Sequence, residues 1–172
     1  MIIEAHNLRK TFKDVTALDD LELSINSGEI FGLLGPNGAG KSTFMNLLSG
    51  YLTQDQGTLT LNDSPYNPSN LAQKSAIGLV PQHIALYEEL SAQENLRIFG
   101  KLYGLSSKKL SDKINFLLER IELDDRRKDL VKGFSGGMKR RLNIASSLLH
   151  EPKVLLCDEP TVGIDPQSRN AI

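Results

Sequence analysis

The chain has 172 residues, 20 basic and 21 acidic, and a formal net charge of -1 at pH 7. Its length and its 40% hydrophobic content allow a real core and exclude a disordered chain. The near-neutral charge argues against nucleic acid as an obligatory partner, and no apolar run approaches the length of a membrane span. A single cysteine, Cys157, and an N-terminus without a secretion signal indicate a cytosolic protein.

The first elements are predicted to be strands. Residues 2–8 form one strand, and residues 19–26 alternate apolar and polar side chains as a half-buried strand does. Between them we expect a polar turn over residues 9–14 that carries Phe12. Two interpretations of Phe12 stay open: an exposed ring that stacks on an adenine, or a ring tucked into the local core.

A glycine-rich loop follows and organises the rest of the chain. The run Gly35-Pro36-Asn37-Gly38-Ala39-Gly40-Lys41-Ser42-Thr43 fits the phosphate-binding pattern G-x-x-x-x-G-K-[ST] without a mismatch. The preceding residues 29–34 are predicted to be a short buried strand, and residues 44–50 a helix that stops at a glycine. This strand–loop–helix context makes a phosphate site a stronger interpretation than a plain turn.

Each residue type in this loop has a chemical reason. Glycines at positions 35, 38 and 40 permit positive φ and let backbone N–H groups approach an anion. The helix that follows directs its positive dipole end to the same place. Lys41 can reach the β- and γ-phosphates, and Ser42 can place its hydroxyl on Mg²⁺.

Further strands are expected at residues 56–63 and 77–80, with a short helix starting near residues 67–71. Gln82 comes just after the strand at 77–80, where ligands bind in open α/β sheets. It is a site candidate, and a solvated loop glutamine is the alternative.

The stretch of about 83–152 is predicted to be helical. Ser91 to Glu94 is a capping box that opens one helix, and a second over residues 106–121 carries an apolar stripe expected to be core. A third helix follows the run Phe134-Ser135-Gly136-Gly137-Met138. Ser135 is a good N-cap, whereas two glycines after it are poor helix formers. That cost favours bare amides at a second anion site, and an ordinary capped helix start is the alternative.

Residues 153–160 are predicted to be a buried strand that ends in two carboxylates. Asp158 is placed to hold Mg²⁺, directly or through water, and Glu159 to orient or deprotonate the water that attacks a γ-phosphate. Two exposed strand-end acids without a role are the alternative.

Taken together, these residues resemble an ATP-binding cassette (ABC) ATPase, the nucleotide-binding subunit of ABC transporters. The resemblance covers the whole chain, and five motifs in order carry it: the glycine loop at 35–43, Val80-Pro81-Gln82, the run 134–138, the strand end 154–160 and Gly163-Ile164-Asp165. It implies an α/β fold, a P-loop NTPase (RecA-like) core with an N-terminal antiparallel β subdomain and an inserted α-helical subdomain. In a single domain, residues 1–82 and 153–172 would form the core and residues 83–152 the helical subdomain.

The resemblance also assigns roles. Phe12 matches the adenine-stacking aromatic, Gln82 the glutamine that senses Mg²⁺ and the attacking water, and Asp165 the aspartate that crosses a dimer interface. Glu159 and Gln82 are the expected catalytic residues, and Ser42, Gln82 and Asp158 the expected metal ligands. The residues expected to bind nucleotide are Phe12, Gly35, Pro36, Asn37, Gly38, Ala39, Gly40, Lys41, Ser42, Thr43, Ser135, Gly136, Gly137 and Asp165.

Ser135 to Met138 match the signature motif, which the family uses in trans on the triphosphate held by a second subunit. The family usually has Gln where this chain has Met138, and the run 136–142 is similar to the ABC-2 type exporter branch. ATP and Mg²⁺ are the implied cofactors. A second nucleotide-binding subunit and a transmembrane permease are the implied partners, so the chain would lie on the inner face of the cell membrane.

One departure concerns the switch histidine, which the family places roughly thirty residues past the catalytic glutamate. Only thirteen residues follow Glu159, and His6, His83 and His150 lie elsewhere. The chain therefore resembles a cassette cut short, in which nucleotide binding should survive better than turnover. Two other classes remain: a soluble ABC ATPase acting on DNA or ribosomes, and a regulatory module that binds ATP without dimerising.

Overall fold

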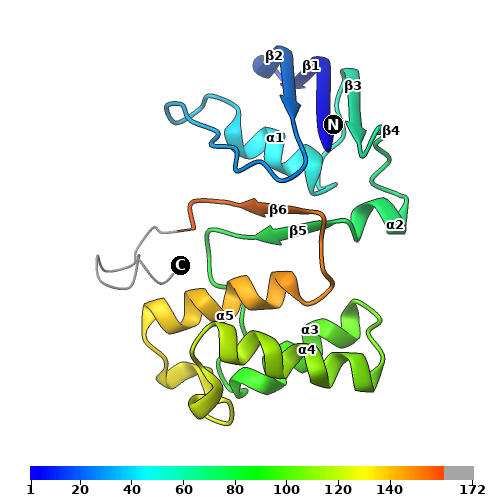
Figure 1. The fold of residues 1–172 in the computed structure, drawn as a ribbon. Coiled ribbons are helices and arrows are strands. Elements are labelled where there is room, and N and C mark those ends of the chain that lie inside the picture. Colours follow the sequence, from blue (N-terminus) through cyan, green and yellow to red (C-terminus); the bar gives the residue numbers. More distant parts are fainter. Residues whose placement is uncertain (161–172) are drawn as a thin grey trace. The chain divides into compact units, whose positions relative to one another are not determined.

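A computed structural model describes residues 1–160 and divides into two compact units. Unit 1 is Met1–Ile77, and unit 2 begins at Gly78 (Figure 1). The predictions for residues 161–172, including Asp165, lie outside the described residues.

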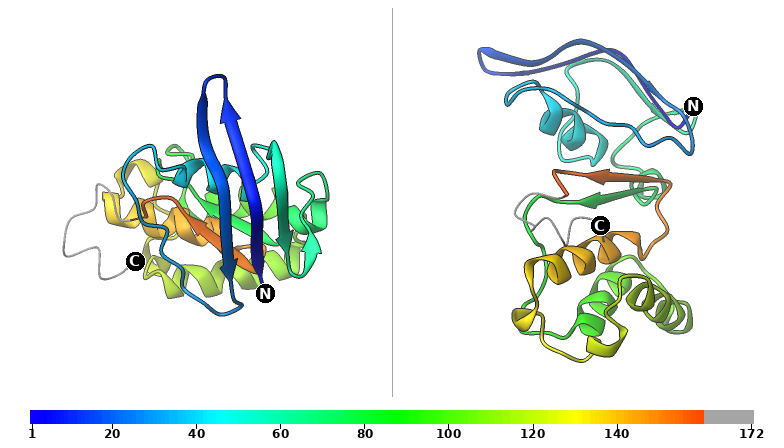
Figure 2. Two further views of the ribbon diagram at one scale, coloured as in Figure 1. Left: turned by 90° about the horizontal axis from the view of Figure 1, so that it is seen from above. Right: turned by 60° about the vertical axis from the view of Figure 1, so that its left-hand side comes forward.

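Unit 1 is built on a four-stranded antiparallel sheet of order β2-β1-β3-β4. The strands are β1 (Ile3–Phe12), β2 (Val15–Ile25), β3 (Gln56–Leu61) and β4 (Ser64–Pro65), and Figure 2 shows the length of the first two. The predicted strands were therefore correct in kind, but β1 runs through most of the predicted turn. Ile3, Ala5 and Leu8 supply its buried face.

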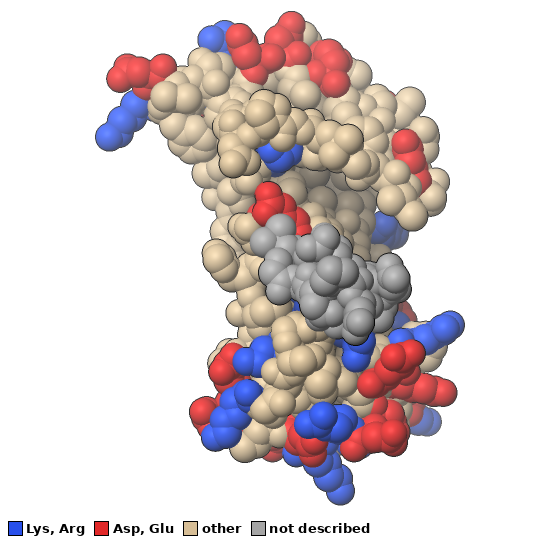
Figure 3. Space-filling view, turned by 90° about the vertical axis from the view of Figure 1, so that its left-hand side faces the viewer, with Lys and Arg blue, Asp and Glu red and all other residues tan. Residues whose placement is uncertain are grey.

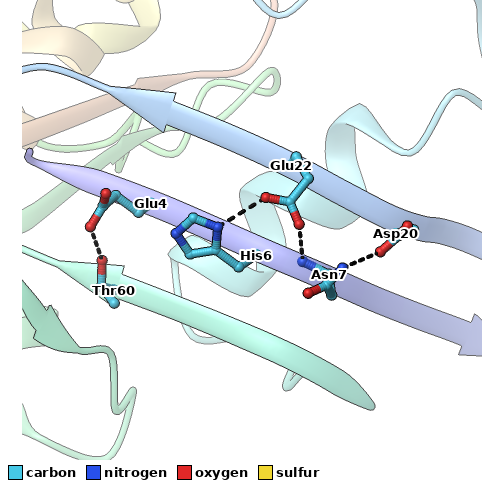
Figure 4. A network of polar contacts seen from close by, with 6 residues as sticks. All are labelled: Glu4, His6, Asn7, Asp20, Glu22 and Thr60. Carbon is cyan, nitrogen blue, oxygen red and sulfur yellow. Dashed lines mark hydrogen bonds and ion pairs between the residues drawn. The ribbon is translucent and has the colours of Figure 1, made fainter.

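A polar network fixes the irregular part of this sheet (Figure 4). The pairing of β1 with β2 shifts register between Ala5 and Leu8, and Asn7 there has φ 47°. Glu22 on β2 accepts from the Asn7 backbone N–H at 2.6 Å and lies 2.9 Å from His6 Nδ1. The carboxylate thus satisfies a backbone donor that the shifted ladder leaves without a strand partner.

The predicted buried strand at 29–34 was wrong. Those residues form no strand, and the exposed fractions of Ile30 and Leu34 are 102% and 93%. A buried strand exists only when neighbouring strands pair with it, and residues 29–34 pair with none in the described part of the chain. The apolar pattern of residues 29–34 indicates a preference for burial, but it does not show whether a neighbouring strand is there to pair with them.

The loop leads into α1 (Lys41–Leu48), which buries Phe44, Leu47 and Leu48. Its far end is anchored because the buried Tyr66 hydroxyl donates to the Leu48 carbonyl oxygen at 2.6 Å. The short α2 (Leu71–Lys74) completes unit 1.

The strand β5 (Ile77–Val80) starts at the boundary and lies mostly in unit 2. It pairs with β6 (Val154–Cys157), and the two strands point the same way in Figure 1. Both predicted strands are confirmed as strands. The predicted burial of the second was wrong, because only Leu156 in β6 is buried and Leu155 is 38% exposed.

Three helices form the core of unit 2: α3 (Ala92–Leu102), α4 (Ser107–Arg120) and α5 (Gly136–Leu148). Short 3-10 turns, η1 (Asp124–Arg126) and η2 (Val131–Gly133), connect α4 to α5. The predicted capping box is confirmed, since Ser91 and Glu94 each accept from the other's backbone N–H. The predicted stripe on α4 is also confirmed, because Leu110, Ile114, Leu117 and Leu118 are buried. Among residues 1–160, no helix has both the length and the apolar character that a membrane crossing requires.

Candidate functional site

The glycine loop in unit 1 presents backbone donors on its outer side. Residues 35–39 are exposed, and Gly38 and Gly40 have φ of 86° and 82°. Gly35 does not have positive φ, so its predicted conformational role was wrong. The first bond of α1 runs from the Phe44 N–H to the Gly40 carbonyl oxygen at 2.9 Å. The N–H groups of residues 41–43 therefore have no partner within the helix and can bind an anion.

Gly40 is required by packing as well as by backbone conformation. A Cβ there would lie 2.4 Å from the Ala17 carbonyl oxygen and 2.7 Å from Leu18 Cδ2. The loop thus closes directly onto β2, and that contact fixes where α1 begins.

Lys41 and Ser42 follow the glycines of this loop and are the first two residues of α1. Lys41 Nζ donates to the carbonyl oxygens of Gly35 and Pro36 at 2.6 and 2.8 Å. The ammonium group therefore lies over the loop, within reach of an anion bound to its N–H groups. Ser42 is exposed in the first turn of α1, where its hydroxyl is available to a metal ion beside the phosphates.

Phe12 ends β1 in the same unit, and its side chain is 42% exposed. The interpretation of Phe12 as a core residue was therefore wrong. Lys10 Nζ lies 5.6 Å from the ring centroid, so one face carries a cation–π contact. An exposed aromatic ring is a surface on which a base can stack.

Unit 2 brings two of the predicted residues into direct contact. Gln82 Nε2 donates to Glu159 Oε2 at 2.8 Å. The two lie just past the ends of β5 and β6, and the Asp158 N–H donates to the Val80 carbonyl oxygen at 3.0 Å. Glu159 has φ 45°, a conformation that costs a non-glycine residue free energy and recurs at functional sites.

The predicted second anion site is the start of α5. Ser135 is the N-cap, and its hydroxyl accepts from the Met138 N–H at 3.2 Å. Gly136 is exposed, and a Cβ there would meet nothing within 4 Å. The packing of the described residues therefore does not require a glycine at 136.

The sequence analysis missed Arg140, which follows the signature run on α5. Its side chain is buried, with an exposed fraction of 2%, and it donates to carbonyl oxygens just past both β5 and β6. Burial lowers the pKa of Arg140, although a guanidinium stays protonated in proteins. A helical-periodicity signal was present, since Arg140, Asn143 and Ser147 form a polar stripe at i, i+3 and i+7.

The residues expected to hold Mg²⁺ have suitable chemistry. Mg²⁺ prefers oxygen ligands and is usually held by one or two protein groups together with substrate phosphates. Ser42, Gln82 and Asp158 supply a hydroxyl, an amide and a carboxylate oxygen. Within residues 1–160 no cluster of three or more acidic, histidine or cysteine side chains could hold a metal by itself.

The candidate residues fall into two groups. Unit 1 contains Phe12 and the loop 35–43, and unit 2 contains Gln82, the turn 135–137, Asp158 and Glu159. Within unit 2 Gln82 bonds to Glu159, and Arg140 donates to the carbonyl oxygen of Gln82 and to those of the two residues that flank Glu159.

The chain is similar to known ABC transporter proteins in sequence and in fold. A family model described as "ABC transporter" matches residues 18–162. The chain is 46% identical over 171 residues to the Linearmycin resistance ATP-binding protein LnrL of Bacillus subtilis (strain 168), covering 99% of this chain and 55% of that protein. It is 43% identical over 171 residues to the Nod factor export ATP-binding protein I of Cupriavidus metallidurans (strain ATCC 43123 / DSM 2839 / NBRC 102507 / CH34), covering 99% and 56%.

The fold is similar to that of cbiO1 from Clostridium perfringens, described as part of the ABC transporter complex cbiONQ. The TM-score is 0.89 at 28% identity, over 98% of this chain and 69% of that one. The predicted fold class is confirmed by this likeness. The chain spans about half the length of the two curated relatives.

Proposed function

The chain belongs to the ABC transporter ATP-binding family, and we propose that it binds and hydrolyses ATP to power a membrane exporter. The observation that carries the proposal is the loop of residues 35–43: residues 35–39 are exposed, Gly38 and Gly40 have positive φ, Lys41 Nζ donates to the Gly35 carbonyl oxygen, and the first N–H groups of α1 have no partner within that helix. Export as the direction is supported by two relatives, one named for antibiotic resistance and one for Nod factor export.

In this proposal unit 1 holds the nucleotide. The loop N–H groups and Lys41 bind the phosphates, and Phe12 stacks on the adenine. Ser42, with Asp158 and Gln82, would hold Mg²⁺, which neutralises charge on the phosphates when bound. On the face of unit 2 in the lower part of Figure 3, Lys and Arg side chains alternate with Asp and Glu side chains, which disfavours a nucleic-acid partner at that face.

Unit 2 carries out the chemistry. Glu159 is the base that accepts a proton from the attacking water, and the bond from Gln82 keeps its carboxylate oriented. Ser135, Gly136 and Gly137 would contact the triphosphate of a second copy, which explains why Gly136 has no side chain although the chain leaves room for one. Asp165 would lie at that dimer interface.

The partners and the location follow from the same proposal. A permease subunit would supply the membrane spans and recruit this protein to the inner face of the membrane. The helical part near residues 83–152 would carry the signature turn. Residues 1–82 and 153–172 would form the nucleotide-binding core.

The test uses the natural full-length protein with its permease in vesicles. We expect Mg²⁺-dependent release of phosphate from ATP that increases when the permease is present. ATP binding without phosphate release would favour a regulatory module. Stimulation by DNA or ribosomes, and none by the permease, would favour the soluble class of ABC ATPase.

A further inference from the structure

We propose that Arg140 is a positioning residue for hydrolysis, which holds the backbone on both sides of the Gln82–Glu159 pair. The inference rests on the proposed ATPase function and extends it to a side chain that need not touch ATP. Nothing in the phosphate-binding or signature pattern assigns this role.

The geometry places one guanidinium between the two strand ends. Arg140 Nη1 donates to the carbonyl oxygens of Pro81 and Gln82 at 2.6 and 3.2 Å. Its Nε donates to the Pro160 carbonyl oxygen at 2.7 Å, and its Nη2 to that of Asp158 at 3.3 Å. All three nitrogens are therefore used, two on the loop after β6 and one on the loop after β5.

Burying the Arg140 guanidinium costs free energy, which indicates that this side chain does more than fill space. Arg140 is 2% exposed, and its side-chain hydrogen bonds within residues 1–160 go to backbone carbonyl oxygens. A buried cation loses hydration that backbone carbonyls replace only in part, whereas an apolar side chain of similar length would pack there at less cost. What the guanidinium adds is a planar fork that holds several oxygens at fixed spacing.

The Arg140 guanidinium holds the backbone on both sides of Glu159, the residue with positive φ. Glu159 has φ 45°, and the carbonyls that Arg140 holds belong to the residues immediately before and after it, Asp158 and Pro160. Residues in sparsely populated backbone conformations persist only when their surroundings hold them there. Arg140 therefore fixes the direction in which the Glu159 carboxylate points. Its bond to the Gln82 carbonyl oxygen also holds the backbone of Gln82, whose side chain pairs with that carboxylate.

The same helix holds more of the loop that carries Gln82. The Ser147 hydroxyl donates to the Leu79 carbonyl oxygen at 2.7 Å, and the Ala85 N–H donates to Asn143 Oδ1 at 3.2 Å. The polar stripe of α5, namely Arg140, Asn143 and Ser147, thus binds the backbone between residues 79 and 85. Ser135 is the N-cap of α5, so the same helix that carries the predicted signature motif also carries the side chain that holds the backbone beside Gln82 and Glu159.

The experiment compares Arg140→Met and Arg140→Lys in the full-length protein with its permease. The control is Arg120→Met, which removes an exposed guanidinium from α4. The measurements are kcat per ATP-binding site, KM, the ATP dissociation constant and the melting temperature. We expect Arg140→Met to lower kcat by about 10²-fold, as misplaced catalytic groups do, with KM and ATP affinity within about twofold of the parent.

Arg140→Lys keeps the charge but loses the fork, so its kcat should lie between those of the parent and Arg140→Met. Arg120→Met should match the parent. A kcat within about twofold of the parent in Arg140→Met, or in Arg140→Lys if only that variant folds, overturns the inference. A fall in total phosphate release with an unchanged kcat per ATP-binding site also overturns it, because that result means that part of the protein has unfolded. A parent without ATPase activity would instead refute the proposed function.

Discussion

Two helices of this protein begin at glycine-rich turns, and they are built differently. Helix α1 in unit 1 has the left-handed Gly40 as its N-cap and no side-chain cap. Helix α5 in unit 2 has Ser135 as its N-cap, and the Ser135 hydroxyl accepts from the helix. A Cβ at Gly40 would strike β2, whereas a Cβ at Gly136 would meet open space.

The difference separates what the fold needs from what function needs. Gly40 is explained completely by contacts within unit 1. Gly136 has no such explanation among the described residues, and in the proposed function its missing side chain leaves room for the triphosphate of a second copy. Unit 1 is accordingly the binding half of the proposal, and unit 2 the half that acts on what is bound.

The largest expected effect isolates turnover from binding. Glu159→Gln removes the base in unit 2, so ATP hydrolysis should fall by about 10²- to 10⁴-fold while the ATP affinity of unit 1 is unchanged. Phosphate release and ATP titration measure the two quantities. Glu122→Gln, an exposed glutamate of unit 2 that also has positive φ, is the matched control and should behave as the parent. Normal turnover in Glu159→Gln would remove Glu159 as the base.

The next largest expected effect is on stability, when Gly40 or Gly136 is replaced by alanine. Gly40→Ala should lower the free energy of unfolding by about 1 to 3 kcal/mol, because alanine must adopt φ near 82° against the Ala17 carbonyl. Gly136→Ala should keep or slightly raise stability, since alanine is the better helix former. Urea unfolding of both variants measures the contrast. Equal losses would mean that Gly136 is also a packing residue.

A smaller effect concerns the caps. Ser135→Ala should cost about 1 kcal/mol of unfolding free energy, because the Met138 N–H loses its acceptor. Ser42→Ala, in the first turn of α1, should change stability by less than about 0.5 kcal/mol. Denaturant titrations compare the two. A large stability loss in Ser42→Ala would show that its hydroxyl supports the fold and is not spared for a metal.

The smallest effect is a pH dependence in each unit. The hydrogen bond from Lys10 lowers the pKa of Asp55, and the hydrogen bonds from Ser91 lower the pKa of Glu94. Their contributions to stability are therefore present above the ordinary carboxyl pKa and are lost as pH falls through the lowered values. Asp55→Asn and Glu94→Gln should each differ most from the parent near neutral pH, and the difference should shrink in acid.

Salt distinguishes the two carboxylates. Asp55 pairs with a charged ammonium group, so 1 M salt should reduce the effect of Asp55→Asn. Glu94 is held by a hydroxyl and a backbone N–H, so the effect of Glu94→Gln should change less. Thermal melts across pH at two salt concentrations measure both. Identical salt responses would contradict these assignments.

Sequence periodicity predicted the helices of unit 2 well because each helix makes its own hydrogen bonds and needs only one apolar face. Leu110, Ile114 and Leu117 were found this way. It failed for residues 29–34, because a buried strand depends on partners that the local pattern does not contain.

The candidate site shows the same contrast between local signals in the sequence and contacts with distant residues. Lys41, Ser42 and Glu159 could be predicted as site residues because their chemistry is tied to a local spacing that a pattern can match. Arg140 was missed, because its role depends on carbonyl oxygens about 20 and 60 residues away in the chain. Spacing along a helix shows that a polar side chain lies near the buried face but does not show what it binds.

The most direct measurement is calorimetric titration of folded protein with ATP in the presence of Mg²⁺, beside Lys41→Ala. The account predicts one ATP bound per chain in the parent and an affinity about 10- to 100-fold weaker in Lys41→Ala, the range expected when a charged hydrogen bond is lost. No binding in the parent, or equal binding in the two proteins, would contradict it.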